Sequence, residues 1–312
     1  TVSDAGQISY KGQPIKNFYI EGLDLMKGRY GIATNNIDPN SISTIEVLEN
    51  HQDIKALKDL KPEERASINL KLKSGVKGVF NLIATLGGGY VDKLLWDNEL
   101  ITTYFQRNSQ LLATYKGNNS GTDLESELRS HTDYDYSRTS TISDIAMPAT
   151  PGINKRYYYF NQSHSATYNQ VFRVGKNGEL GINAAYLNDR DERSNQSVTT
   201  TLLPDGSKNV VDESFNGILH RNIANGNITY MQNTERNYIK EQLKFDWLST
   251  DGYSNIYAGE DIIQENNVEN YRLHNLFHLT SRTGSDKGVE FLSKINLEKK
   301  PHSLSVAPNL FP

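Results

Sequence analysis

From Lys77 onwards, apolar residues recur at every second position over long segments of the chain. In the first of these segments one face carries Phe80, Leu82, Ala84 and Leu86. The same period appears in the segments 180–187, 239–247, 273–279 and 289–297. A period of two is typical of a β-strand with one apolar and one polar face. Such segments are long enough to be tilted strands that cross a bilayer, which need about 9–11 residues.

The connections between these segments differ in length in a regular way. Short turns rich in Gly, Asn and Asp are predicted at 107–109, 175–178, 250–253 and 283–287. Of the intervening connections, two are long and polar (118–155 and 200–227) and two are short (near 91–93 and 265–268). Barrels of outer membranes have short turns at one end and longer loops at the other. The pattern therefore predicts about nine strands of an antiparallel transmembrane β-barrel, which can have roughly 22 strands in all.

The first 75 residues have a different character. Short strands are predicted at 7–10, 14–20, 42–48 and 66–73, and a short helix after Leu25. Turns containing Gly or Pro join them. The chain is thus predicted to be mainly β, with a small α+β domain at 1–75 followed by barrel strands at 76–312.

Composition narrows the classes of function. The 312 residues include 33 basic and 37 acidic side chains, a net charge of −4, so the excess of basic residues typical of nucleic-acid-binding proteins is missing. Cys is absent, which excludes disulfides and Cys-bound metals. Without an apolar run of about 18 residues no transmembrane helix is predicted. A mean hydropathy of −0.62 still permits a barrel, because only alternate strand residues meet lipid.

Motifs for catalysis are missing from the sequence. It contains no nucleophile elbow, P-loop or paired-histidine motif, so we predict no enzyme, catalytic residue, metal ion or cofactor. Nor does it open on a signal peptide or end on a closing strand. Nine strands would leave open edges, whose unpaired backbone groups cost several kcal/mol each in hydrocarbon. We therefore expect the chain to be a fragment, cut at both ends.

Three motifs in the N-terminal part resemble the plug domain of TonB-dependent outer-membrane receptors, in the form common in Bacteroidetes-type bacteria. They are YIEG at 19–22, ISTIEVL at 42–48 and ASINLKL at 66–72. Together with the alternating strands, the resemblance covers nearly the whole chain. The family usually has aspartate where Glu21 stands, and arginine-glycine-proline where 49–51 reads Glu-Asn-His. Since that arginine commonly anchors the plug, the anchoring is expected to differ here.

The resemblance implies a receptor in the outer membrane of a Gram-negative bacterium. Such receptors take up a scarce ligand, for example an iron chelate or an oligosaccharide, and TonB supplies the energy from the periplasm. The implied partners are TonB, outer-membrane lipid and a small-molecule ligand, with no nucleic acid. The segment that docks TonB would lie upstream of these residues.

Several residues are candidates for a functional site. The resemblance puts Glu46 inside the lumen, where an unpaired charge is costly, so it could act as a latch to a basic residue of the barrel wall. Alternatively it is a solvated strand carboxylate. Arg29 and Tyr30 lie in a Gly-flanked loop and are candidates for the ligand vestibule; the alternative is that they are ordinary residues of a plug loop.

The long connection 118–155 holds further vestibule candidates, His131, Tyr134 and Tyr136. Histidine and aromatic side chains could grip a metal chelate or stack on a sugar, but the spacing of metal ligands is lacking and a solvated loop is the alternative. The charged run 189–193 is expected where its strand leaves the lipid. His274 and His278 are expected in the lumen and not at a zinc site.

Two alternatives to transport remain. One is a β-rich surface module that binds glycans or acts as an adhesin without a transport role, and the other is a structural or enzymatic domain. The direction of seven apolar strand residues distinguishes the transport receptor from a surface module. In a barrel these seven side chains face outwards, whereas in a β-sandwich they form one buried interior. The residues in question are Phe80, Leu82, Leu180, Ile182, Phe245, Trp247 and Phe291.

Overall fold

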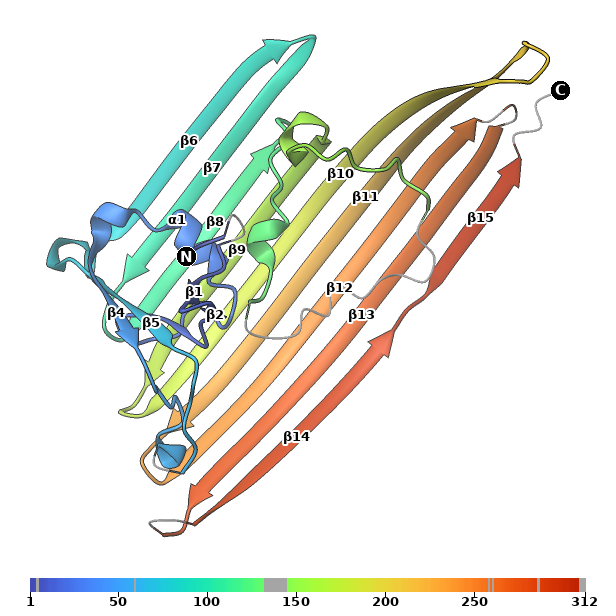
Figure 1. The fold of residues 1–312 in the computed structure, drawn as a ribbon. Coiled ribbons are helices and arrows are strands. Elements are labelled where there is room, and N and C mark those ends of the chain that lie inside the picture. The colour runs from blue at the N-terminus through green and yellow to red at the C-terminus, as the bar shows by residue number, and fades with distance from the viewer. Residues whose placement is uncertain are drawn as a thin grey trace.

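Most of the chain forms one large antiparallel sheet of ten strands (Figure 1). The computed structural model describes residues 1–3, 6–58, 60–131, 145–257, 259, 261–284 and 287–308. The strands of the large sheet are β6 (Phe80–Val91), β7 (Lys93–Phe105), β8 (Ser109–Asn118), β9 (Phe160–Val174), β10 (Gly178–Leu202), β11 (Lys208–Asn233), β12 (Asn237–Tyr257), β13 (Asp261–Arg282), β14 (Gly288–Lys299) and β15 (His302–Pro308). The predicted fold class, mainly β with a large antiparallel sheet, is confirmed.

Strands that follow each other in sequence are neighbours in the sheet, from β6 at one edge to β14 at the other. β14 and β15 pair with successive parts of β13, so the sheet is nine positions wide, as predicted. β10 and β11 contain 25 and 26 residues, far more than a typical strand of about 5–6 residues. Because each strand from β6 to β14 pairs antiparallel with the next strand in sequence, every second connection among them lies at the same end.

Four tight connections lie at one end of the sheet, which we call the tight-turn end. They join β7 to β8, β9 to β10, β11 to β12 and β13 to β14, and span 106–108, 175–177, 234–236 and 283–287. At the opposite end the chain passes from β8 to β9 through its longest connection, whereas β6 and β7, β10 and β11, and β12 and β13 are joined there by connections as short as those of the tight-turn end. Short turns predicted near 107, 175 and 283 are confirmed, as are the long connection after Asn118 and the short one near residue 92.

Three predicted connections are wrong, because they lie inside strands. The range 250–253 belongs to β12, 265–268 to β13, and most of 200–227 to β11. Asp-Gly resembles a turn, but Gly252 is explained by packing, since a Cβ there would lie 2.7 Å from Cδ1 of Ile145. In the other two ranges apolar and polar residues do not alternate regularly, as at Val210-Val211 and Ile218-Leu219, so the pattern that identifies a strand is missing.

Five short strands lie outside the large sheet. β1 (Ser9–Tyr10) and β2 (Gln13–Pro14) form a hairpin, while β3 (Phe18–Ile20), β5 (Ser67–Leu72) and β4 (Ile42–Leu48) form a three-stranded sheet in that order. β3 runs parallel to β5, and β4 runs antiparallel to it. The helices are α1 (Gly31–Asn36) and the 3₁₀ helices η1 (Pro39–Ser41), η2 (Lys55–Leu57), η3 (Ser74–Val76), η4 (Ser126–Leu128) and η6 (Lys155–Tyr157).

None of the helices in the described part of the chain combines the length and the apolar character needed to cross a membrane.

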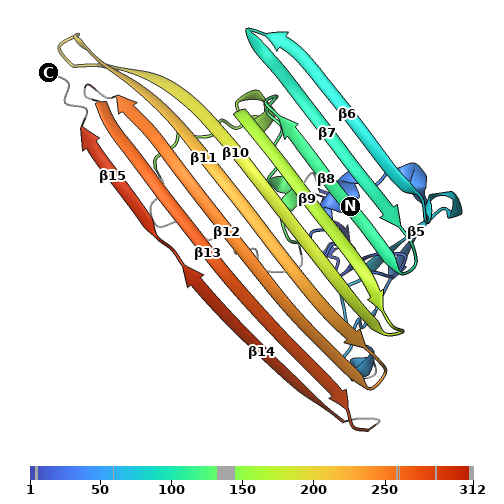
Figure 2. The same ribbon diagram turned by 180° about the vertical axis from the view of Figure 1, so that it is seen from behind.

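The N-terminal segment, defined here as residues 1–76, lies against one face of the large sheet (Figures 1 and 2). We call this the inner face and the opposite one the outer face. Apolar side chains of the segment, among them Phe18, Ile20 and Tyr30, share one core with Phe105 and Leu112 of the inner face. A smaller cluster joins Ile54, Ala56 and Leu57 to Tyr238 on β12. The N-terminal segment therefore buries its apolar residues partly against the sheet.

The outer face carries apolar side chains that meet solvent in this structure. All seven residues predicted to point outwards do so: Phe80, Leu82, Phe245 and Phe291 are between 44% and 61% exposed, and the other three are half-buried. Their cross-strand partners put them on the face opposite the N-terminal segment. No closed apolar interior forms from these positions, so the sandwich alternative is wrong for the described residues.

Aromatic residues of the outer face fall into cross-strand rows. One row contains Tyr115 on β8, Tyr186 on β10, Trp247 on β12 and Tyr271 on β13. A second row, nearer the tight turns, contains Phe172, Tyr230 and Phe277. Aliphatic residues such as Ile182, Ile228 and Leu243 share a row between the two.

Candidate functional site

Side chains of the inner face hold the backbone of the N-terminal segment. Gln110 on β8 donates a hydrogen bond from Nε2 to the carbonyl oxygen of Ile20, at 2.8 Å. Asn183 on β10 donates from Nδ2 to the carbonyl oxygen of Leu25, at 2.9 Å. Both side chains are almost completely buried. The carbonyl oxygen of Ile20 also accepts a hydrogen bond from the N–H of Leu23. The bond from Asn183 satisfies the carbonyl oxygen of the buried Leu25, and an unpaired buried carbonyl group costs about 1–3 kcal/mol.

A third attachment lies near the tight-turn end. Asn233 at the end of β11 accepts a hydrogen bond from the backbone N–H of Lys55 at 3.0 Å and donates one to the carbonyl oxygen of Asp53 at 2.6 Å. One amide thus fixes two backbone groups at the start of η2. The smaller apolar cluster beside Tyr238 lies at the same place.

Buried amides form a continuous chain across four strands of the inner face. Asn183 donates to Asn169 on β9 at 3.0 Å, Asn227 on β11 donates to Asn183 at 3.4 Å, and Gln242 on β12 donates to Asn227 at 3.0 Å. Each residue is less than 9% exposed. Because the same Asn183 also donates to the carbonyl oxygen of Leu25, this chain of amides connects the large sheet to the N-terminal segment.

A buried ion network anchors the long connection 119–159. Arg221 on β11 contacts Asp189 on β10 at 2.5 Å and Glu125 of the connection at 2.9 Å. Asp189 also accepts hydrogen bonds from Ser163 at 2.6 Å and from Tyr159 at 2.5 Å, and is only 3% exposed. A charge buried to this extent is tolerated when it is paired and fully hydrogen-bonded. The network therefore ties both ends of the connection to the inner face.

A polar cavity of about 360 Å³ lies between the N-terminal segment and the sheet at the tight-turn end. Its lining includes Tyr19, Lys27, His51, Asp53 and Glu179. The ammonium of Lys27 lies 4.0 Å from Glu179 on β10, so an ionic contact crosses the cavity. Burial lowers the pKa of His51, which favours its neutral form at pH 7. The N-terminal segment and the large sheet are therefore separated at this place by a space lined with polar and charged side chains.

Lys16 holds an ion cluster inside the N-terminal segment. Its ammonium lies 2.6 Å from Asp53 and 2.5 Å from Glu63. Burial opposes the charge on Lys16, but hydrogen bonds to both carboxylates raise its pKa. Burial would also raise the pKa of Glu63, yet hydrogen bonds from Lys16 and from the N–H of Arg65 lower it. Both shifts favour the charged pair.

This cluster predicts loss of stability at both extremes of pH. A lowered Glu63 pKa stabilises the fold above the ordinary carboxyl range, about pH 4, and this contribution is lost as the pH falls through the folded-state value. A raised Lys16 pKa stabilises the fold below about pH 10 and is lost as the pH rises through its folded-state value. Amide hydrogen exchange in the N-terminal segment, corrected for intrinsic rates, measures both limbs. Glu63→Gln should flatten the acid limb, whereas Glu64→Gln at the exposed neighbour should leave it unchanged.

Glu46 has partners within its own small sheet. Its carboxylate accepts a hydrogen bond from Asn69 at 2.6 Å and lies 3.8 Å from the ammonium of Lys71, both on β5. A latch to the large sheet stays a prediction. Glu21, where the family usually has aspartate, adopts a φ of 50°. It accepts a hydrogen bond from the N–H of Leu72 at 2.6 Å and so closes a turn against β5.

Three of the vestibule candidates come together. Tyr30 is fully buried, Arg29 is 9% exposed, and the ring of His131 lies 4.9 Å from the ring of Tyr30. The backbone N–H of His131 donates to the carbonyl oxygen of Gly28 at 2.9 Å, which ties the long connection to the N-terminal segment. Tyr134 and Tyr136 lie outside the described residues. Ligand contact by any of these residues stays a prediction, and Tyr30 has no exposed surface.

The sequence interpretation missed the residues that attach the long connection. Asp189 and Asp191 of the charged run point to the inner face and are buried, whereas Arg190 and Glu192 belong to the other face. The alternation of the preceding strand could have assigned Asp189 to the polar face. Its partner Arg221 carried no such signal, because the surrounding range was interpreted as a loop.

The two histidines of β13 lie on the inner face. His278 contacts Glu290 on β14 at 2.8 Å, and His274 hydrogen-bonds Asn296 on the same strand. Among the described residues no group of three His, Asp or Glu side chains is arranged to hold a metal ion.

Comparisons with known proteins give a distant likeness to solved structures. No protein-family model matches the chain, and no curated protein matches it. Among solved structures, the chain is similar to the open form of the ferric-catecholate import receptor Fiu from E. coli K12, with 9% sequence identity and a TM-score of 0.20. The match covers 96% of this chain and 61% of that one, so this chain spans about three-fifths of the receptor's length. At this TM-score the likeness carries no argument about function.

Proposed function

We propose that this chain is part of an outer-membrane receptor, in which residues 1–75 are the later part of a plug and residues 76–312 are part of a transmembrane β-barrel. The observation that carries the proposal is the sorting of side chains on the same strands. Apolar residues between aromatic rows point away from the N-terminal segment, and buried amides point towards it. A soluble protein would bury the apolar face, whereas a barrel in lipid exposes it.

The height of the apolar band fits a membrane. On β12 the outer face is apolar at Ile239, Leu243, Phe245 and Trp247, with Glu241 as the exception. Eight steps of about 3.3 Å give roughly 26 Å along the strand, or about 20 Å across a membrane at the usual tilt of barrel strands. Barrels of outer membranes have an apolar band about 25 Å tall between aromatic girdles.

The inner face supports a receptor with a plug and not an open pore. The N-terminal segment covers the polar side of β8 to β12 and is held there by Gln110, Asn183 and Asn233. We propose that this cover is the plug, that it moves when TonB pulls on it, and that the ligand is a scarce solute such as an iron chelate or an oligosaccharide. The host would be a Gram-negative bacterium with Bacteroidetes-type plugs.

Membrane extraction tests the location. We expect the protein to remain in the pellet when membranes of its cells are washed with alkaline carbonate, and to be released by detergent, because the outer-face band needs an apolar surrounding. A periplasmic protein and a known barrel serve as controls. Release by carbonate alone would contradict the membrane assignment and favour a surface module.

Uptake tests the receptor role in the same cells. We expect uptake of a labelled ferric catecholate or of a labelled neutral oligosaccharide that depends on this protein and stops when a protonophore collapses the inner-membrane gradient. Accumulation that persists without the gradient would contradict energy coupling. If neither probe enters in a protein-dependent way, the two named ligand classes are wrong.

A further inference from the structure

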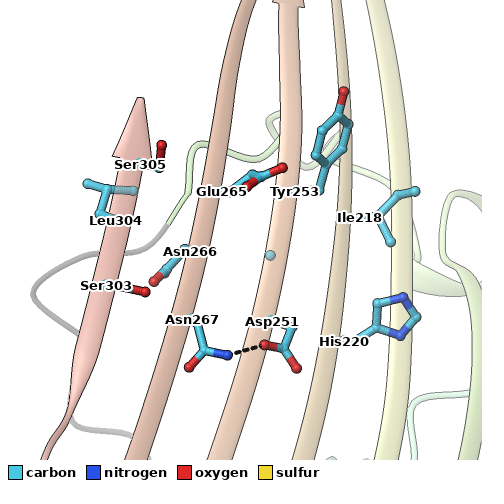
Figure 3. Close-up of a pocket in the computed structure, with 11 residues that line it drawn as sticks. Ile218, His220, Asp251, Tyr253, Glu265, Asn266, Asn267, Ser303, Leu304 and Ser305 are labelled. Carbon is cyan, nitrogen blue, oxygen red and sulfur yellow. Dashed lines mark hydrogen bonds between the residues drawn. The ribbon is translucent and has the colours of Figure 1, made fainter. Parts of the chain in front are cut away.

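The outer face has a hollow of about 510 Å³ beyond the aromatic row that contains Trp247 and Tyr271 (Figure 3). Strands β11, β12, β13 and β15 build it. The side chains that matter here are Ile218, His220, Asp251, Tyr253, Glu265 and Asn267.

Pairing between strands puts these side chains on the outer face. Asp251 lies between His220 on β11 and Asn267 on β13. In the next row Tyr253 lies between Ile218 and Glu265. On β12, Asp251 and Tyr253 are an even number of positions from Trp247, so their side chains lie on the same face as Trp247. The inner-face residue between them, Gly252, is buried. The hollow therefore belongs to the outer surface and not to the face that the N-terminal segment covers.

The hollow lies just above the apolar band. Asp251 and Tyr253 are four and six positions beyond Trp247 on the same strand, or roughly 13 and 20 Å along it. They lie towards the end that carries the long connection 119–159. In the proposed membrane orientation this height is the headgroup layer of the outer leaflet, where the glycolipid headgroups of Gram-negative bacteria present sugar units beside phosphates.

We propose that this hollow binds a neutral hexose unit of the glycolipid headgroups that surround the barrel, an inference that rests on the proposed membrane location. Asn267 donates a hydrogen bond from Nδ2 to Asp251, at 2.5 Å, and the close-up shows the two side chains pointing at each other. This bond orients both groups. The second carboxylate oxygen of Asp251 and the amide oxygen of Asn267 can each accept a proton from a sugar hydroxyl.

An apolar platform lies beside these acceptors. Tyr253 is 40% exposed, and Ile218 on the neighbouring strand is half-buried. An aromatic ring with an adjacent aliphatic side chain offers the flat apolar surface on which the C–H face of a pyranose packs. On the far side, β15 presents the hydroxyls of Ser303 and Ser305, which can both donate and accept.

Charge selects a neutral sugar over an anionic one. Asp251 and Glu265 contribute two carboxylates, and among the described residues that line the hollow only His220 can carry a positive charge. A phosphate or a uronic acid would be repelled by this field, while a hydroxyl would not. Because all of these groups stand on hydrogen-bonded strands, the hollow is held in shape before the ligand arrives.

Saturation-transfer NMR on the intact protein in detergent tests the site. The probes are the methyl glycosides of glucose, galactose and mannose. Methyl glucuronide, which carries a carboxylate on the glucose ring, serves as the anionic control. We expect binding of at least one neutral glycoside, with the glucuronide weaker by about tenfold. Tyr253→Ala and Asn267→Ala should each weaken neutral binding by about tenfold, which is the loss of one good contact. Tyr257→Ala, on the same strand and face but outside the hollow, should leave binding unchanged.

A second arm identifies the source of the sugar. In nanodiscs that contain lipopolysaccharide, the headgroup should compete with the free neutral glycoside and reduce its signal, whereas phospholipid nanodiscs should not. Undiminished glycoside binding beside lipopolysaccharide would overturn the glycolipid assignment. Binding that requires added Ca²⁺, equal binding of the glucuronide, or no binding by a protein that still requires detergent would each overturn the sugar site. If the protein needs no detergent at all, the proposed membrane location fails instead.

Discussion

Replacing Ile182 by arginine should destabilise the protein in a bilayer by about 2–4 kcal/mol. Ile182 lies on the outer face of β10, where it pairs with Gln170 on β9 and Ile228 on β11. Its row lies between the row of Tyr230 and the row of Tyr186, in the middle of the apolar band. The folded protein would hold the arginine charge in hydrocarbon, away from water, and this desolvation lowers the free energy of unfolding. Urea unfolding in lipid vesicles measures it.

The matched control uses the same strand and the same face. Val198 on β10 is 59% exposed and lies far beyond the aromatic row that contains Tyr186. Val198→Arg should change the unfolding free energy by less than about 0.5 kcal/mol, since a surface position outside lipid tolerates charge. If both substitutions had the same small effect, the outer face would not be a lipid-facing surface. An equal large loss at Val198 would contradict the position of the band.

Replacing Arg221 by methionine should cost about 3–5 kcal/mol, because removing one partner of a buried ion pair leaves the other charge uncompensated. Asp189, which is 3% exposed, would keep its charge among Ser163 and Tyr159 without the guanidinium. Glu125 would lose the contact that holds the connection 119–159 to the sheet. We therefore expect a lower unfolding midpoint and faster proteolysis within this connection.

A second ion pair serves as the control for Arg221. Arg190 lies on the outer face of β10 and contacts Glu192 at 2.9 Å, with both side chains more than a third exposed. Arg190→Met should cost less than about 1 kcal/mol, the usual limit for an exposed pair. The double variant Arg221→Met/Asp189→Asn should recover part of the loss, because the buried carboxylate is then neutral. A single-variant loss no larger than that of Arg190→Met would show that the network does not hold the connection.

The positions missed by sequence interpretation share a cause. Gly252 follows an aspartate and carries the signature of a turn, yet the side chain of Ile145 occupies the space that a Cβ would need. Residues 208–216 of β11 alternate poorly, and the first six of them are exposed on both faces of the strand. In each case the local pattern is the same in a loop and in a strand. For Gly252 the deciding contact comes from a distant part of the chain, whereas for 208–216 it is the pairing with 194–202 of the preceding strand β10.

The sequence by itself determined the type of the strands and the direction of their apolar side chains. Successive side chains of a strand point to opposite faces, so a period of two assigned Phe80, Ile182 and Phe245 to one surface without any knowledge of their neighbours. Only the tertiary structure decided which polar residues meet across the inner face. Asn183 finds the carbonyl oxygen of Leu25 across 158 positions of sequence, and Arg221 finds Asp189 across 32. Such pairs depend on strand register and on which segment covers the sheet. Neither of these can be identified from the periodic pattern of apolar and polar residues.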